Sequence, residues 1–130
     1  MEDSLDASGV SALIKRGQNI LNALTDESIK VAENQNDDPQ RPDVRAAVTA
    51  RDSSGERPFS NTVFLMREAF FRGDLSSAQM GRAIAHEADH LENNGIDTAY
   101  RQSPNFFRIT SDQAANNPDS VLRALQFRDP

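Results

Sequence analysis

Apolar positions along this chain follow two different periods, and the first stretch has the period of a helix. Between residues 10 and 24, apolar side chains recur at three- and four-residue steps, which predicts an amphipathic helix capped by Ser8 or Ser11. Gly17 weakens this helix midway, and residues 1–8 are predicted to form a flexible tail. We expect the apolar stripe of the helix to pack on a sheet. The stripe consists of Val10, Leu13, Ile14, Ile20, Leu21 and Leu24.

A second helical pattern lies between residues 76 and 93. Ser76 and Gln79 have the spacing of a capping box, and good helix formers follow them. Apolar residues at three- and four-residue steps predict that one side of this helix is buried. Gly95 is expected to adopt the left-handed conformation that ends it.

Three runs have the composition or alternation of β-strands, at residues 28–33, 44–51 and 62–66. A polar loop with two prolines, at residues 34–42, separates the first run from the second. Turn-forming residues at 52–58 predict a hairpin between the second and the third.

The last part of the chain is predicted to be helical again. Residues 112–127 have the pattern of a final helix interrupted near Pro118, with Leu122 facing inward. Phe106 and Phe107 are expected in the core. Together these patterns predict one α+β domain, with an N-terminal helix, a short mixed or antiparallel sheet of about three strands, the helix that ends near residue 93, and a C-terminal helix.

Composition narrows the class of partner. The chain has 130 residues, a formal net charge of −6 and no cysteine. A nucleic-acid partner is not expected, because phosphate binding needs a basic surface. An acidic surface would steer basic substrates toward the protein, or would only keep it soluble. The polar start has no signal-peptide pattern and no apolar run approaches the length of a membrane span, so no membrane partner is expected.

The two histidines of the chain enclose a glutamate, in the order His86-Glu87-Ala88-Asp89-His90. Positions i and i+4 of a helix share a face, so both imidazoles can bind the same Zn²⁺ ion. Glu87 is then placed to take a proton from water on the metal. This H-E-x-x-H pattern indicates a zinc peptidase with one zinc ion per chain; the plain alternative is a surface helix with two solvated histidines.

A catalytic zinc site needs a third protein ligand, and the chain offers no further histidine and no cysteine. A carboxylate must therefore supply it. Asp97 follows the end of the helix closely enough to turn back toward the metal, whereas Asp89 and Glu92 point away from the histidine face. Asp112 and Asp119 are more distant options.

Residues 95–100, Gly-Ile-Asp-Thr-Ala-Tyr, resemble the G-T-x-D-x-x-Y signature of the aspzincins, the deuterolysin-like and lysine-specific zinc endopeptidases. Asp97 and Tyr100 keep the D-x-x-Y spacing, and Tyr100 is the only tyrosine of the chain. Residues 114–120 are similar to an N-A-D-S segment of that family. The resemblance covers roughly residues 61–120.

The resemblance implies a role for each residue of the motif. His86, His90 and Asp97 would bind Zn²⁺, and Glu87 would be the general base. Tyr100 would help to stabilise the oxyanion, which agrees with the ability of a phenol near the metal to donate a hydrogen bond to developing charge. The function that follows is hydrolysis of peptide bonds by a metal-activated water.

The resemblance also bears on substrate binding. In zincins the strand before the active-site helix is a sheet edge that pairs with extended substrate, and residues 62–66 would have that role. Aspzincins often favour lysine or another basic residue after the cut, held by a carboxylate, for which Asp112, Asp89 and Glu92 are candidates. The family segment also suggests that Asp119 orients a ligand histidine.

The chain departs from the aspzincin pattern at several points, and two alternatives stay open. The interval from His90 to Asp97 is short, Ile96 replaces a threonine, and Arg101 replaces a glycine. Residues 86–91 also resemble the H-E-x-D-H-L of peptide deformylases, although the cysteine ligand and the glycine-rich loop of those enzymes are missing. The other alternative is a non-catalytic, zinc-stabilised binding module, whose metal would be closed off by four protein ligands.

A short, cysteine-free zincin without a leader also suits a toxin or effector module cut from a longer secreted chain. Lysine-specific domains similar to aspzincins are used in that way at the ends of bacterial polymorphic toxins. The expected partners are a protein or peptide substrate and, for a toxin, a cognate inhibitor or immunity protein. The domain itself is expected to be a monomer, acting in the cytoplasm or after delivery as part of a longer chain.

Overall fold

The computed structural model describes residues 7–100 and 103–125. Its elements follow the chain as α1 (Ala7–Thr25), β1 (Lys30–Gln35), β2 (Ala46–Ala47), β3 (Thr62–Met66), α2 (Arg67–Phe71), α3 (Ser77–Asn93), α4 (Ser111–Ala115) and α5 (Pro118–Ala124). The domain is α+β, as predicted. Of the predicted tail, residues 1–6 lie outside the described part, whereas Ala7 and Ser8 already belong to α1. Within the described ranges, no helix has the length and apolar character needed to cross a membrane.

The three strands form one mixed sheet in the order β1-β3-β2. β3 pairs in parallel with β1, where Val31 lies opposite Val63, and antiparallel with β2, where Ala46 lies opposite Leu65. The predicted hairpin between the second and third strands is therefore present. The prediction that residues 62–66 form a sheet edge is wrong, because β3 has a partner on both sides, and the edge that contacts α3 most is β2.

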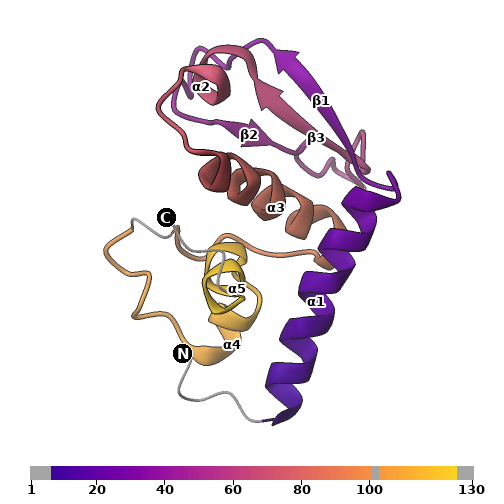
Figure 1. Cartoon of the computed structure of the whole chain (residues 1–130), viewed down its shortest axis with the longest axis vertical. Coiled ribbons are helices and arrows are strands. Elements are labelled where there is room, and N and C mark those ends of the chain that lie inside the picture. The colour runs from indigo at the N-terminus through magenta and orange to yellow at the C-terminus, as the bar shows by residue number, and fades with distance from the viewer. Residues whose placement is uncertain (1–6, 101–102, 126–130) are drawn as a thin grey trace.

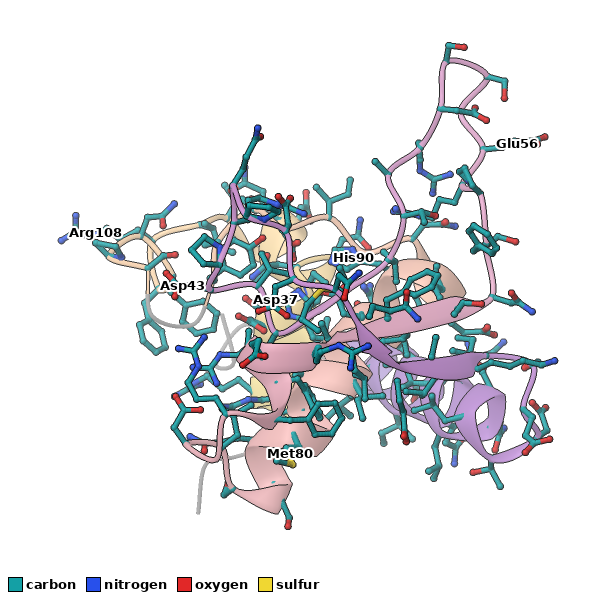
Figure 2. The ribbon with its side chains drawn as sticks, turned by 90° about the horizontal axis from the view of Figure 1, so that it is seen from above. Asp37, Asp43, Glu56, Met80, His90 and Arg108 are labelled. Atoms are coloured by element: carbon teal, nitrogen blue, oxygen red, sulfur yellow. The ribbon has the colours of Figure 1, made fainter. Side chains whose placement is uncertain are left out.

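The second strand is much shorter than the predicted run at residues 44–51. Just after β2, side chains form hydrogen bonds with backbone carbonyl groups that could otherwise pair between strands in a longer hairpin. The guanidinium of Arg57 donates to the carbonyl of Thr49 at 2.6 Å, and the hydroxyl of Thr49 donates to the carbonyl of Pro58. In Figure 2 the loop that follows β2 and carries Glu56 extends away from the body of the domain.

Helix α3 lies between two layers (Figure 1). The sheet is on one side of it, and α1 and α5 are on the other. The core is built from Val63 and Leu65 of β3, Ala85 and Ala88 of α3, and Leu122 of α5, all of them buried. The α3 helix is consequently fixed from both sides, which gives the side chains of its remaining face a defined orientation.

The prediction that α1 packs on a sheet holds only in part: α1 contacts mainly α3 and α5, although its Ile20 and Ala23 belong to the same core as Val63 and Leu65 of β3. Ile20 is buried, but Ile14 and Leu21, which belong to the predicted stripe, are 51% and 64% exposed. Gly17 permits a close approach to α5, since a Cβ at this position would lie 2.9 Å from the Cδ1 atom of Leu125. The buried face of α1 thus includes fewer residues than the apolar stripe predicted from the sequence.

Both ends of α3 have identifiable caps. The side chain of Ser76 accepts a hydrogen bond from the N–H of Gln79, and the Gln79 side chain accepts one from the N–H of Ser76, so the predicted capping box is present. At the other end, Asn94 has a φ of 55° and takes the left-handed position. The prediction that Gly95 takes the left-handed position is wrong. Gly95 is instead closely packed against Asp89 and Pro118.

The C-terminal part is helical and is interrupted at Asn116 and Asn117, directly before Pro118, as predicted; the two pieces are α4 and α5. Pro118 begins α5, where its missing N–H is not needed. Leu122 is fully buried, as predicted. Phe106 is buried, but Phe107 is 75% exposed and lies under the guanidinium of Arg123, 4.9 Å from its ring centre. The predicted end of the helix, at residue 127, lies outside the described residues.

Candidate metal centre

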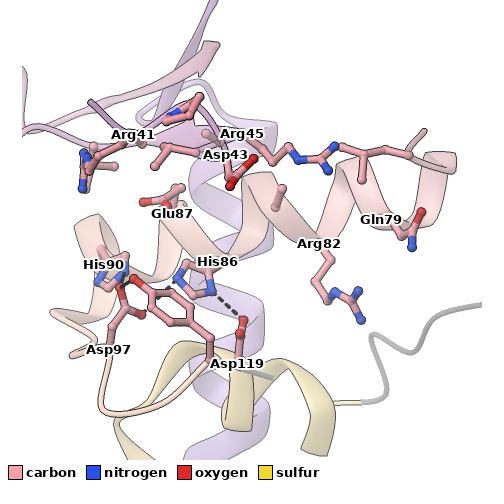
Figure 3. Close-up of a pocket in the computed structure, with 18 of the residues that line it drawn as sticks. Arg41, Asp43, Arg45, Gln79, Arg82, His86, Glu87, His90, Asp97 and Asp119 are labelled. Carbon is pink, nitrogen blue, oxygen red and sulfur yellow. Dashed lines mark hydrogen bonds and ion pairs between the residues drawn. The ribbon is translucent and has the colours of Figure 1, made fainter. Parts of the chain in front are cut away.

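Helix α3 presents both histidines to a cleft (Figure 3). His86 and His90 are one helical turn apart and are 9% and 7% exposed. Together with Glu87 they form a group whose candidate ligand atoms all lie within 4.8 Å of one another. This buried group could hold a metal ion.

Each histidine has one ring nitrogen in contact with an acceptor. Nδ1 of His86 lies 2.6 Å from Oδ1 of Asp119, and Nδ1 of His90 lies 2.7 Å from the carbonyl oxygen of Gly95. When the imidazoles are neutral, these acceptors place the proton on Nδ1 and leave a lone pair on Nε2. That is the tautomer a metal requires, fixed by groups behind the ligands. The contact with Asp119 is the one expected from the sequence.

Asp97 lies on the loop after α3 and faces both histidines. Its Oδ1 atom is 3.0 Å from Nε2 of His86, and its Oδ2 atom is 3.0 Å from Nε2 of His90. Ligand atoms around a tetrahedral zinc ion, at bond lengths of about 2.0–2.1 Å, are roughly 3.3 Å apart. The three side chains therefore have the donor types that zinc accepts and nearly the separation that it needs.

The loop that carries Asp97 is held by a fully buried amide, that of Asn117. Oδ1 of Asn117 accepts from the N–H groups of Thr98 at 2.9 Å and Ala99 at 3.1 Å. Nδ2 donates to the carbonyl of Ala99 at 2.8 Å and to the hydroxyl of Ser120 at 2.9 Å. These bonds fix the backbone next to Asp97. They therefore restrict the position of its carboxylate, which lies against the histidines.

A buried ion pair supports the centre from behind. Asp89 has no exposed surface, and its carboxylate accepts from Nε and Nη2 of Arg16 at 2.7 and 2.5 Å. Gly95 lies against this pair, and a Cβ on it would be 2.6 Å from Oδ2 of Asp89 and 2.8 Å from Cγ of Pro118. Gly95 is therefore needed for space, and that close packing positions the carbonyl that accepts from His90.

In the metal-free centre, burial and hydrogen bonds have opposite effects on the pKa values of the histidines and Asp97. Burial lowers the pKa of His86, but its bonds to Asp119 and Asp97 outweigh burial and raise that pKa to about 10. Burial likewise lowers the pKa of His90, and Asp97 and the Gly95 carbonyl raise it overall. Burial raises the pKa of Asp97, but the two histidines hold it well below its usual range. A metal ion would take the place of the protons in this cluster.

Glu87 projects from α3 toward the wall that carries Arg41 and Arg45 (Figure 3). Burial raises the pKa of the Glu87 carboxyl, and the neighbouring His86 and His90 lower it in part. A carboxylate whose pKa is raised toward neutrality is better suited to accept and return a proton than an exposed one.

Tyr100 lies on the other side of the centre. Its ring stacks on that of His86, with centroids 6.0 Å apart and planes 14° apart, and its hydroxyl donates to Oδ2 of Asp97 at 3.2 Å. The side chain is about half exposed. Burial of the hydroxyl and the charge of Asp97 raise the pKa of Tyr100, so the phenol keeps its proton and acts as a donor.

The cleft over the centre has a volume of about 940 Å³. One wall is formed by residues 40–48, which include β2, and the opposite side by Asp97, Tyr100 and Asp119. The base is α3. Because β2 pairs with the sheet along one side only, the free edge of the strand is available to a chain lying in the cleft.

Three of the carboxylates considered from the sequence lie elsewhere. Asp89 is buried against Arg16, and Glu92 and Asp112 are exposed and do not line the described part of the cleft. Asn117 and the Gly95 carbonyl were missed, because an amide 20 residues beyond Asp97 and a backbone oxygen have no motif of their own. The A-A-N-N-P-D sequence at residues 114–119 was the only available signal.

No protein-family model, curated protein or solved structure matches this chain. The resemblance to aspzincins and the role as a toxin or effector module consequently stay predictions from the sequence. A function for the domain has to be argued from the chemistry of the site itself.

Proposed function

We propose that this domain is a zinc-dependent endopeptidase in which His86, His90 and Asp97 hold the metal and Glu87 is the general base. One observation carries this proposal. Each Nε2 atom faces a different oxygen of the same carboxylate at 3.0 Å, while each Nδ1 atom is bound to an acceptor. Three protein ligands leave the open fourth position that distinguishes catalytic zinc sites from structural ones.

The reaction is hydrolysis, and each of the surrounding side chains has a defined part in it. Zinc, when bound, polarises the scissile carbonyl and lowers the pKa of water. Glu87 accepts a proton from the attacking water and passes it to the leaving amine, so that it ends the cycle as it began. Tyr100, which donates to Asp97 in the metal-free centre, can turn its hydroxyl to the negative charge that develops on the carbonyl oxygen.

Substrate binding follows from the sheet. Ala46 and Ala47 of β2 line the cleft, and their outer backbone edge has no strand beside it in the described sheet. An extended peptide added to this edge would gain main-chain hydrogen bonds irrespective of its sequence. It would run along α3 and pass over Glu87 and the histidines.

The proposal is tested by measuring zinc content and peptide hydrolysis on matched variants. Wild type should bind about one zinc ion per chain and cleave an unfolded protein such as casein. Glu87→Gln should keep the metal and lose at least about 100-fold in turnover. Glu92→Gln, an exposed glutamate of the same helix, is the control and should behave as wild type. A zinc-loaded wild type that cleaves nothing, or an active Glu87→Gln, would refute the proposal.

The third ligand is tested separately. Asp97→Ala should lose most of its zinc, whereas Asp112→Ala, which removes an exposed carboxylate outside the cleft, should not. Equal zinc content in the two variants would mean that another group completes the site.

The second candidate is a zinc-stabilised binding module, and one observation favours it. The candidate ligand atom of Glu87 lies within 4.8 Å of those of both histidines, so Glu87 could be a ligand in place of a base. With Asp97, that would make four protein ligands and a closed, structural site. In this case Glu87→Gln would lose zinc and melt at a lower temperature, an outcome that differs from the one expected of a peptidase.

A further inference from the structure

The cleft is basic away from the metal centre, although the chain as a whole carries a net charge of −6. Beyond the candidate ligands, Glu87 and Asp119, the charged residues that line its described part are Arg41, Asp43, Arg45, Arg57 and Arg82. These walls hold four arginines and one aspartate, and two of the arginines, Arg41 and Arg45, are paired with carboxylates that do not line the cleft. Zinc in the centre would add to this positive potential.

Arg82 is placed directly beside the centre. It lies four residues before His86, which in turn lies four residues before His90, so the three side chains follow one stripe of α3 along the cleft. In Figure 3 the Arg82 side chain stands next to His86 and Asp119 on the side nearer the start of the helix. A substrate group just to that side of the reacting carbonyl would meet this guanidinium.

Arg57 approaches from the loop after β2. Its Nη1 atom donates to the carbonyl of Thr49 at 2.6 Å, but its Nε atom is buried and has no hydrogen-bond partner among the described residues. Arg57 lines the cleft together with Glu87 and the two histidines. Arg51 of the same loop donates to Asn94 at 2.9 Å, which holds the loop near the far end of α3. Arg57 thus reaches the cleft from the loop after β2, and Arg82 reaches it from α3.

The other two arginines, Arg41 and Arg45, contribute mainly to the electrostatic potential of the cleft. Arg45 donates to both oxygens of Asp74, at 2.8 and 3.1 Å, and to the carbonyl of Ala69 at 3.2 Å. The Arg41 side chain is 65% exposed and lies 3.4 Å from Asp38. Both are already paired with a carboxylate, whereas the buried Nε atom of Arg57 has no hydrogen-bond partner among the described residues.

Resting on the peptidase function proposed above, we propose that the cleft selects peptides with an acidic side chain next to the scissile bond, bound by Arg82 and Arg57. A guanidinium donates two parallel N–H groups to a carboxylate, which gives short and geometrically specific contacts. Repulsion from the acidic remainder of the protein is screened over about 8 Å at physiological salt, whereas these contacts act within the cleft. A lysine in the same place would be repelled by both guanidinium groups.

Fluorogenic peptides that differ only in the residues flanking the cut, as glutamate, glutamine or lysine, test this proposal on the zinc-loaded protein. For wild type, kcat/KM should be at least about tenfold higher with glutamate than with glutamine, and lowest with lysine. In Arg82→Gln and Arg57→Gln the ratio of glutamate to glutamine should fall toward one, and Arg82→Glu should move the preference toward lysine. Arg108→Gln removes an exposed arginine outside the cleft and should keep the wild-type ratio.

A second readout separates this inference from the peptidase function. Zinc-loaded Glu87→Gln should bind a fluorescein-labelled glutamate peptide more tightly than the lysine peptide, with an affinity that falls as salt rises and falls again in Arg82→Gln. Cleavage without a preference for glutamate, or with a preference for lysine, overturns the inference and leaves the peptidase standing. Selective binding without any cleavage supports the inference and removes the peptidase. Neither cleavage nor selective binding overturns both.

Discussion

The side chain of Asn117 and the backbone of Ala99 form a closed pair of hydrogen bonds. The N–H of Ala99 donates to Oδ1 of Asn117 at 3.1 Å, and Nδ2 of Asn117 donates to the carbonyl of Ala99 at 2.8 Å. Both residues are buried. The first turn of α5 is thereby joined to the loop of Asp97, so that the third proposed ligand is positioned by a part of the chain that never touches the metal.

Replacing Asn117 with alanine should weaken both the fold and the metal site. The buried N–H groups of Thr98 and Ala99 would lose their acceptor, which should lower the free energy of unfolding by about 2–4 kcal/mol. The loop would also lose its constraint, so zinc affinity should fall more than a purely global loss of stability predicts. Urea unfolding and zinc titration below the melting range measure the two effects. Asn105→Ala, at an exposed position, should change neither.

Two glycines of the same region should respond to alanine in opposite directions. Gly95→Ala would force a Cβ to within 2.6 Å of the Asp89 carboxylate, so it should cost about 2 kcal/mol or more and disturb the acceptor of His90. Gly81 lies in α3 with nothing within 4 Å of the added atom. Gly81→Ala should therefore stabilise the protein by about 0.5–1 kcal/mol. Thermal unfolding of both variants checks this, and a neutral Gly95→Ala would contradict the close packing described.

Local patterns predicted the parts of this fold that depend on neighbouring residues. The capping box of Ser76 and Gln79, the run at residues 62–66 and the face shared by His86 and His90 all follow from spacing within a few residues. Helix α3 also contains the H-E-x-x-H motif, which is why its candidate metal ligands could be named from the sequence.

The parts that could not be predicted depend on contacts between distant residues. Arg16 meets Asp89 across 73 positions of the chain, and Asn117 meets Ala99 across 18. Neither pairing leaves a periodic trace in the sequence. The central position of β3 in the sheet could not be predicted either, because it depends on which strands pair with β3 and not on the composition of β3 itself. The arginines of the cleft come from three separate segments, so their common surface is visible only after folding.

The ion pair of Arg16 and Asp89 should show strong coupling in a double-mutant cycle. Asp89→Leu should cost about 3–5 kcal/mol, since it leaves the mostly buried Arg16 without its carboxylate. The double variant Arg16→Met with Asp89→Leu should recover part of this loss. The exposed pair of Arg41 and Asp38 is the matched control, with an expected coupling below about 1 kcal/mol. Urea unfolding of the wild type and of the three variants for each pair gives both couplings, and similar values would show that the buried pair is not coupled more strongly than the exposed one.

The metal-free centre should make stability fall as the solution becomes alkaline. The pKa of His86 is raised from 6.5 to about 10, so its contribution is complete below pH 6.5 and is lost as the pH rises toward 10. The pKa of Asp97 is lowered from 3.8, so its contribution is present above about pH 4 and is lost on further acidification. In EDTA, the melting temperature should therefore decline between about pH 6.5 and 10.

Zinc should reverse this dependence, because the imidazoles must release their protons before they can bind it. With zinc in excess, the melting temperature should stay level or rise over the same range of pH, and the gap between the two curves should widen. Asp97→Asn removes the carboxylate shared by both histidines, so it should flatten the curve in EDTA and shrink the effect of zinc. If wild type and Asp97→Asn gave the same slope in EDTA, the three side chains would not form one protonated cluster in solution. The proposal that they exchange these protons for a metal ion would then lose its basis.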